Sequence, residues 1–284
     1  MTGIIVINKP ADWTSHDVVA KMRGILKEKR IGHGGTLDPM ATGVLPLFVG
    51  RATRAVEFMD DADKEYIAGM RLGITTDTQD MTGNILERKD ADVSADTVAA
   101  ELRNLHGAMD QLPPMYSAVK VSGKKLYEYA RSGREVERRA RRIFIYEAEP
   151  LGFADGEYRF RLVCSKGTYV RTLCHDIGER LGCGAAMSSL VRTRAGCFGI
   201  DEALSIEQAE SLGGAALAPT DTMFRHLPAL IADGADERRI RCGNPPQAAA
   251  ENGRYRIYAP GGEFLALGEA RDGKIDIIKS FFEV

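Results

Sequence analysis

The sequence predicts an α+β fold, in which a mostly antiparallel mixed sheet with flanking helices is followed by a small β-rich C-terminal domain. Segments of alternating polarity and segments of helical spacing follow one another without a regular β-α-β order, which favours this class over a parallel α/β fold. Beyond Leu227-Pro228 the chain has closely spaced turn signals and three short strand-like runs that end at Val284. The predicted domains are therefore 1–227 and 228–284.

The first elements are a strand, a helix and a loop. Residues 3–7 are continuously apolar, as in a buried strand. Thr14 or Ser15 can cap a helix, and the apolar residues of that helix lie on one face: Val18, Val19, Met22 and Leu26. Residues 32–46 are interrupted by Gly and Pro and are predicted to form a loop.

The later elements continue the same mixture of strands and helices. Residues 66–72 alternate, with Tyr66 on the inward face, and residues 158–164 alternate again. Ser94 can cap a helix that carries Val98, Leu102 and Leu105 at helical spacing. Another helix is predicted to end at Gly182, with one apolar face: Val170, Leu173, Ile177 and Leu181.

The composition is that of a soluble globular protein. Among 284 residues, 44% are hydrophobic and 27% are charged, so a substantial core can form without disulfides or a structural metal. The five cysteines follow no C-x-x-C spacing, which favours reduced thiols in the cytoplasm. No apolar run approaches the ~20 residues of a membrane span, so we expect no membrane partner.

Positive charge is concentrated in one segment. Residues 120–142 contain nine Lys or Arg and three Glu, a local excess of +6 in a chain whose net charge is −2. Such a concentration is typical of a nucleic-acid-binding surface. A solvated basic helix face is the alternative that composition alone leaves open.

The loop from Gly32 to Leu45 is the most informative segment for chemistry. Three glycines precede Asp38, and glycine allows a backbone to approach a ligand closely. Pro39 restricts Asp38 to extended conformations, so its carboxylate is held on a stiff loop, where it could act as a nucleophile or general base. An Asp-Pro turn without catalytic function is the structural alternative.

Other catalytic or cofactor motifs do not appear in the sequence. His33 has no Cys or His partner at metal-ligand spacing, and the pair Cys174-His175 is more typical of helix packing. A serine-hydrolase elbow, a Walker A loop and a G-x-G-x-x-G fingerprint are absent. We therefore expect a site that works without a metal or nucleotide cofactor.

The loop from Gly32 to Leu45 resembles the signature loop of the TruB family of pseudouridine synthases, in which the aspartate before proline is catalytic. Further segments resemble motifs of this family in the same order: 8–17, 66–80, 111–131 and 165–171. The resemblance extends over residues 3 to about 200. It implies the pseudouridine synthase fold with a PUA-like C-terminal domain, and an enzyme that isomerises uridine to pseudouridine at position 55 in the T-loop of tRNA.

The resemblance assigns roles to individual residues. Asp38 would be the catalytic carboxylate, and Arg171 would pair with it, lower its pKa and hold its orientation. Tyr66 would stack on the flipped base and help to move a proton. From the residues alone, Arg171 could be a surface arginine and Tyr66 an inward aromatic of a strand.

The remaining candidates would bind RNA or support the catalytic loop. His33 would fill the space that the flipped base leaves in the base stack of the T-loop. Leu190 would line the pocket, and Lys9 with Pro10 would support the loop of Asp38. The resemblance also implies an insertion, about residues 112–142, that clasps the T-arm. The basic residues expected to contact phosphate there are Lys120, Arg131, Arg138, Arg139, Arg141 and Arg142.

Several alternatives remain open at this level. A non-catalytic RNA-binding or RNA-folding protein on the same scaffold is one, and a pseudouridine synthase for another RNA is a second. Attack of Asp38 on the uracil ring, attack on the sugar carbon and proton abstraction all require the same carboxylate. We expect a monomer that needs no protein partner.

Overall fold

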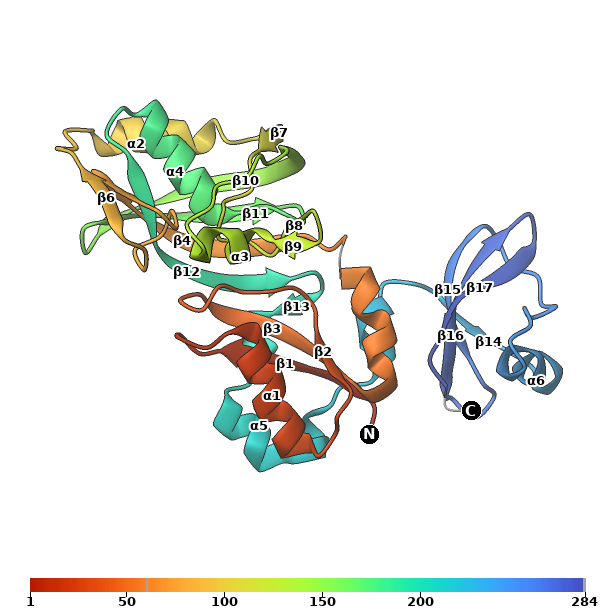
Figure 1. Cartoon of the computed structure of the whole chain (residues 1–284). Helices are drawn as coiled ribbons and strands as arrows, with labels where there is room; N and C mark the ends of the chain where they lie inside the picture. Colours follow the sequence, from red (N-terminus) through yellow and green to blue (C-terminus); the bar gives the residue numbers. More distant parts are fainter. Residues whose placement is uncertain (60, 283–284) are drawn as a thin grey trace.

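The computed structural model describes residues 1–59 and 61–282. Its main sheet has nine strands in the order β1-β3-β12-β4-β11-β10-β7, with β2 paired to β3 and β13 paired to β12 (Figure 1). These strands are β1 (Gly3–Lys9), β2 (Ile31–His33), β3 (Thr42–Val49), β4 (Lys64–Leu72), β7 (Gly107–Gln111), β10 (Arg141–Ala154), β11 (Glu157–Cys164), β12 (Ala185–Ala195) and β13 (Phe198–Gly199). Every pairing in it is antiparallel except that of β3 with β12. The predicted fold class is confirmed.

Helices and small hairpins complete the main body. The α-helices are α1 (Ser15–Leu26), α2 (Ala95–Arg103), α3 (Leu126–Arg131), α4 (Val170–Arg180) and α5 (Ile206–Leu212). The 3-10 helices are η1 (Gly50–Met59), η2 (Ile200–Glu202), η3 (Gly213–Ala216) and η4 (Thr220–Phe224). Two hairpins pair β5 (Ile74–Thr76) with β6 (Ile85–Arg88) and β8 (Lys120–Val121) with β9 (Lys124–Lys125). None of the helices in the described part of the chain has the length and apolar character needed to cross a membrane.

The helices cover the two halves of the main sheet separately. Helices α2 and α4 pack on the half that contains β4, β10 and β11, where Leu102 and Ile177 share a core with Phe160. Helices α1 and α5 pack beside β1 and β3, where Met22 and Ala209 share a second core. Figure 1 shows α1 and α5 beside β1 and β3, and α2 and α4 beside β10 and β11. The parallel pairing of β3 with β12 joins the halves, so residues near it can belong to a site between them.

Local sequence accounts for the first helix. Thr14 is extended and accepts a hydrogen bond from the backbone N–H of Asp17, while the Asp17 carboxylate accepts one from the backbone N–H of Thr14. This capping box satisfies amide groups that the first turn leaves without partners. The buried face of α1 contains the four apolar residues that the helical spacing predicts.

One prediction about local structure was wrong, and one open alternative does not hold. Only residues 34–41 of the segment predicted as a loop are irregular, because the strands β2 and β3 occupy its two ends. Strand β3 forms because β1 and β12 satisfy its backbone on both sides and Val44, Leu45 and Leu47 are completely buried. The basic segment is also not a continuous helix: α3 ends at Arg131, and residues 132–140 form no helix or strand.

The C-terminal part contains a second sheet with its own core. Its order is β14 (Ala229–Ile231), β15 (Gly253–Tyr258), β16 (Phe264–Arg271) and β17 (Lys274–Ser280). The helix α6 (Gly234–Arg241) was not predicted; Asp233 caps it, accepting hydrogen bonds from the amides of Ala235 and Asp236. This part packs on the main body through aromatic rings, since the ring centroids of Phe281 and Phe224 lie 5.9 Å apart with the rings tilted.

Candidate active site

A cleft with a volume of about 1140 Å³ lies beside the irregular loop 34–41. Pockets for small ligands have volumes of roughly 300–1,000 Å³, so this cleft is large enough for a ligand of nucleotide size. The predicted site residues that line it are Asp38, Arg171, Tyr66, His33, Leu190, Arg131, Arg141 and Arg142. The fold therefore brings together residues from the loop, β2, β4, β12, the first turn of α4 and the basic segment.

Asp38 and Arg171 meet in this cleft although they are far apart in the sequence. Arg171 Nη2 lies 3.3 Å from Asp38 Oδ1. The Arg171 side chain is 7% exposed, whereas that of Asp38 is 32% exposed. The arginine is thus part of the cleft wall, and the carboxylate is presented to a bound ligand.

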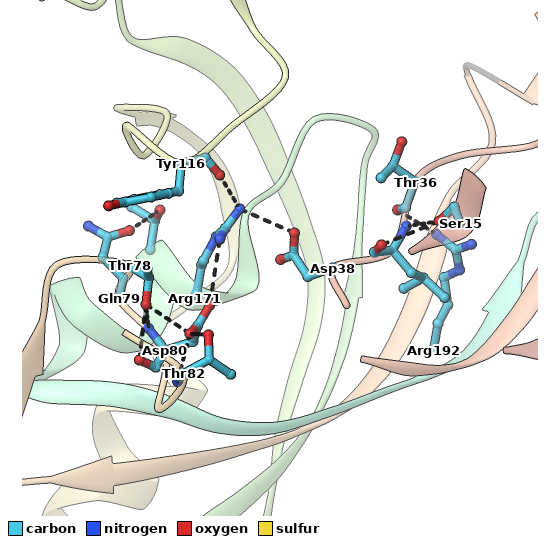
Figure 2. Close-up of polar contacts among 12 residues, drawn as sticks. Ser15, Thr36, Asp38, Thr78, Gln79, Asp80, Thr82, Tyr116, Arg171 and Arg192 are labelled. Atoms are coloured by element: carbon cyan, nitrogen blue, oxygen red, sulfur yellow. Dashed lines mark hydrogen bonds and ion pairs between the residues drawn. The ribbon is translucent and has the colours of Figure 1, made fainter. Parts of the chain in front are cut away.

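Arg171 also bridges Asp38 to a second carboxylate. Its Nη1 lies 3.6 Å from Asp80 Oδ2, and its Nη2 donates a hydrogen bond of 2.7 Å to the backbone carbonyl of Tyr116 (Figure 2). A planar guanidinium held by three groups has little freedom to turn. Arg171 therefore holds the Asp38 carboxylate in one position.

Asp80 was not identified as a site residue from the sequence. Its Oδ1 accepts hydrogen bonds from the Thr78 hydroxyl at 2.8 Å and the Thr82 amide at 3.0 Å, so the carboxylate is fixed before it meets Arg171. Asp80 lies in a segment that resembles a family motif, but no local pattern signals which distant arginine it contacts. Burial to 3% exposure identifies it only in the fold.

Backbone anchors hold the loop that carries Asp38. The buried ammonium of Lys9 donates to the carbonyls of Pro10 at 2.8 Å, Trp13 at 2.5 Å and Pro39 at 3.0 Å. Burial lowers the pKa of Lys9 to about 8. An ammonium has three N–H donors, and these three carbonyls use all of them. Lys9 is not among the residues that line the cleft, so it supports the loop of Asp38 from outside the cleft.

The first turn of α1 anchors the same loop from another side. Ser15 Oγ accepts a hydrogen bond of 2.9 Å from the amide of Leu37, the residue before Asp38. The Leu37 side chain is itself buried in the core, so both its backbone and its side chain are fixed. The stiffness predicted from Pro39 is thus supplemented by contacts that only the fold provides.

The electrostatics of Asp38 differ from the sequence prediction. Burial raises the pKa of Asp38, and the repulsion of Asp80 adds to this effect, while the charges of Arg171 and Lys9 oppose it. Arg171 lowers the pKa of Asp38 as predicted, but burial, which the prediction left out, makes the net direction upward. Desolvation of a carboxylate in a partly closed cleft outweighs the attraction of a guanidinium that Asp80 also engages.

Three further predicted residues form the walls of the cleft. Tyr66 on β4 is 8% exposed and Leu190 on β12 is 7% exposed, so only a small part of each side chain is accessible from the cleft. His33 lies on β2, and burial together with the charge of Arg192 lowers its pKa. Among the described residues no partner bonds to the buried His33 Nδ1. The structure places these side chains at the cleft but assigns them no role.

The predicted basic residues divide into two groups. The first group, Arg131, Arg141 and Arg142, lines the cleft together with Lys125. Lys125 also makes a cation–π contact there, since its Nζ lies 5.4 Å from the centroid of the Tyr127 ring. The second group lies outside the cleft lining: Lys120, Arg138 and Arg139.

Two of the predicted basic residues have partners within the protein. Arg138 donates to the carbonyl of Pro113 at 3.2 Å and pairs with Glu135 at 2.9 Å, so its guanidinium is already engaged. Arg142 pairs with Asp110 at 3.3 Å, although both side chains are more than 60% exposed. The exposed pair can separate at little cost, whereas Arg138 is the less suitable contact for a phosphate.

Two family models match consecutive parts of the chain. The model for the N-terminal domain of the TruB family pseudouridylate synthases matches residues 23–170, and the model for the C-terminal domain of tRNA pseudouridylate synthase B matches residues 171–224. The chain is 46% identical to a tRNA pseudouridine synthase B from Syntrophomonas wolfei, over 98% of this chain and 96% of that protein. It is 48% identical to a tRNA pseudouridine synthase B from Geobacillus thermodenitrificans, over 99% of this chain and all of that protein.

Solved structures are similar over almost the whole chain. One comes from an H/ACA RNP bound to a substrate RNA that contains 2′-deoxyuridine, with a TM-score of 0.74 and 27% identity over 99% of this chain and 85% of that chain. Another comes from a Cbf5-Nop10-Gar1 complex, with a TM-score of 0.73 and 29% identity over 99% of this chain and 85% of that chain.

Proposed function

The chain belongs to the TruB family of tRNA pseudouridine synthases, and from this premise we propose that it isomerises the uridine at position 55 in the T-loop of tRNA. The observation that carries the proposal is the carboxylate of Asp38, which is exposed to a nucleotide-sized cleft and contacts Arg171. The curated relatives are named as tRNA-modifying enzymes over nearly their full lengths.

The reaction breaks the bond from the sugar to the ring nitrogen of uracil and forms a bond from the same sugar carbon to a ring carbon. The ring carbon loses a proton and the ring nitrogen gains one, so substrate and product are isomers. The site has to hold a detached base, allow it to rotate and exclude water. A fixed carboxylate in a cleft whose lining includes the apolar side chains of Leu37, Met187 and Leu190 supports this proposal.

Asp38 is the proposed catalytic residue, and Arg171 is proposed to orient it and favour its ionised form. Attack on the uracil ring, attack on the sugar carbon and abstraction of a proton all start from the carboxylate. Burial raises the pKa of Asp38, and the charges of Arg171 and Lys9 oppose that rise, so both favour the ionised carboxylate. These three residues therefore act as one electrostatic unit.

The target uridine has to leave its stack to reach Asp38, which costs a few kcal/mol. Tyr66 is proposed to stack on the flipped base and to take part in proton movement, with Leu190 lining the same side of the cleft. His33 is proposed to take up space in the loop stack that the base leaves. Its lowered pKa favours the neutral ring, which stacks at a smaller desolvation cost than a cation.

The RNA is proposed to lie across the basic segment. The insertion at about residues 112–142 would clasp the T-arm, with Arg131 and Arg141 at the cleft as its nearest phosphate contacts. The C-terminal region 228–284 is proposed as a PUA-like domain that also touches the tRNA, and 1–227 as the catalytic domain. We further propose that the chain acts as a monomer.

The decisive experiment is to incubate the purified protein with an unmodified tRNA transcript and to map pseudouridine at nucleotide resolution. We expect a single modified site at position 55. A transcript that is bound but unmodified would favour a non-catalytic RNA-binding protein. Modification of ribosomal RNA fragments in place of tRNA would favour a synthase for another RNA.

A further inference from the structure

Arg192 is a completely enclosed cation in the wall of the cleft. It is 1% exposed and lies on β12, and in the described part of the chain no carboxylate forms an ion pair with it. Arg171, by contrast, contacts two carboxylates. Burial of a charge costs several kcal/mol unless its hydrogen-bonding groups are satisfied, so the partners of Arg192 indicate why it is retained.

Arg192 donates hydrogen bonds to backbone carbonyls on both sides of Asp38. Nε donates to Val44 at 2.7 Å, Nη1 to Thr36 at 3.3 Å and Nη2 to Gly35 at 3.1 Å. Figure 2 shows Arg192 beside Thr36, on the side of Asp38 opposite to Arg171. One guanidinium thus fixes the start and the end of the loop that carries the carboxylate.

Tyr66 is the other partner of Arg192. The two residues are direct neighbours across β4 and β12, so their side chains lie on the same face of the sheet. Burial raises the pKa of Tyr66 and the charge of Arg192 opposes that rise, and both side chains line the cleft. A guanidinium has donors but no acceptor, so the Tyr66 oxygen can only accept a hydrogen bond from Arg192. The phenolic proton is therefore free to point at another acceptor.

We propose that Arg192 is a positioning residue that ties the hydroxyl of Tyr66 to the loop of Asp38 and directs the phenolic proton into the cleft. The inference rests on the proposed function, since the acceptor in the cleft would be a carbonyl oxygen of the flipped uracil or the Asp38 carboxylate. The competing view is that Arg192 only anchors the loop. In that view its contribution is independent of the Tyr66 hydroxyl.

A double-mutant cycle separates these views. The variants are Arg192→Lys, Tyr66→Phe and the combination, and the rate constant of pseudouridine formation is measured under single-turnover conditions with saturating tRNA transcript. We expect Arg192→Lys to slow the wild type by about tenfold or more, but to slow Tyr66→Phe by less than about threefold. The affinity for tRNA should stay within a few-fold, because the change acts on the chemical step. Equal losses in both backgrounds would overturn the proposal.

Arg194→Lys is the matched control. Arg194 lies on the same strand, two residues further, and donates to the carbonyl of Gly196 at 3.2 Å, away from the loop of Asp38. It should change the rate by less than about twofold in either background. A large loss here would show that any arginine of β12 affects the rate, which also contradicts a specific role of Arg192.

A pH profile gives a second readout. Arg192→Met removes the charge that opposes the raised pKa of Tyr66, so an alkaline limb caused by Tyr66 should move to higher pH. An unmoved limb would contradict the proposal, as would a failure of both Arg192 variants to fold, which would make the residue an element of the fold alone. A wild-type protein that forms no pseudouridine would instead refute the proposed function.

Discussion

The Asp38 carboxylate experiences two opposing effects. Burial and Asp80 raise its pKa, whereas Arg171 and Lys9 lower it. Burial is the larger effect, so the carboxylate resembles the catalytic acids and bases of other enzymes, whose pKa values lie nearer to neutrality than those of exposed groups. A group of this kind responds strongly to the loss of a single neighbouring charge.

Substitution of Asp38 itself gives the first prediction. Asp38→Asn keeps the shape of the side chain and removes the ionised oxygen, so turnover should be abolished while the affinity for tRNA stays within a few-fold. Pseudouridine release and tRNA binding are the two measurements. Turnover within tenfold of the wild type would remove Asp38 from the mechanism.

Substitution of Arg171 gives the second prediction, which concerns pH. The ionised fraction of Asp38 falls as the pH decreases through its pKa, so the acidic limb of the rate profile should lie above the pH of an ordinary aspartate. Arg171→Met removes the largest effect that lowers this pKa, and the limb should then move to still higher pH with a reduced rate at pH 7. The pH dependence of kcat/KM measures this shift. An unmoved limb with full activity would show that the contact has no catalytic consequence.

At the scale of elements, the junction of β3 and β12 determines the geometry of the site. The parallel register places Gly43 opposite Arg192, and Gly43 has a φ of 101°. A Cβ atom at this position would lie 2.2 Å from the backbone oxygen of Arg192. Only glycine therefore permits the close approach of β3, at which the loop of Asp38 ends, and β12, from which Arg192 projects.

The third prediction follows from this close approach. Gly43→Ala should lower the free energy of unfolding by about 2–4 kcal/mol, because backbone strain and overpacking add. Urea-induced unfolding measures the loss. Gly24→Ala is the control: Gly24 lies within α1 with nothing close to an added Cβ, so the substitution should raise the free energy of unfolding by roughly 0.5–1 kcal/mol. Equal stability of the Gly43 variant and the wild type would contradict the tight junction.

At the scale of the whole molecule, charge is unevenly distributed. The segment 120–142 carries an excess of +6 while the net charge is −2, which leaves −8 for the rest of the chain. An RNA should therefore approach the face that contains this segment and avoid the others. The cleft is lined by basic residues of the same segment, so electrostatic attraction would bring the proposed RNA substrate to the site.

The fourth prediction concerns the salt dependence of tRNA binding. Each neutralised phosphate contributes about 0.7–0.9 to the slope of log affinity against log salt, so three or four contacts give roughly −2 to −4. Replacing Lys125, Arg131 and Arg141 by glutamine should weaken binding and flatten the slope by about 2–3. Turnover at saturating tRNA should change much less, because these side chains position the RNA.

A control with the same change in net charge makes the test specific. Lys29, Arg88 and Arg103 are exposed and lie outside the cleft lining, and their replacement by glutamine should leave the slope nearly unchanged. Arg138 is omitted because Pro113 and Glu135 already engage it. If the wild type, the triple variant of the basic segment and this control variant had equal slopes, the prediction would be contradicted, and the RNA-binding surface would be sought in residues 228–282.

Sequence alone was sufficient where the causes are local. The cap of α1 by Thr14 and the inward side of Tyr66 on β4 depend on neighbours within a few residues, and the structure contains both features. The helix α6 was missed because its eight residues are mostly charged and lack a clear apolar face.

The tertiary structure decided the contacts and the electrostatics. It placed Arg171 between Asp38 and Asp80, and it enclosed Arg192 with no carboxylate paired to it among the residues that the structure describes. It also buried Asp38, so that the net pKa shift is upward although Arg171 lowers the pKa. The physical reason is that ion pairing and desolvation depend on everything within a few ångströms in space. These neighbours come from distant parts of the chain, so a local pattern determines which side chains are available but not which of them meet, nor how much water is excluded around them.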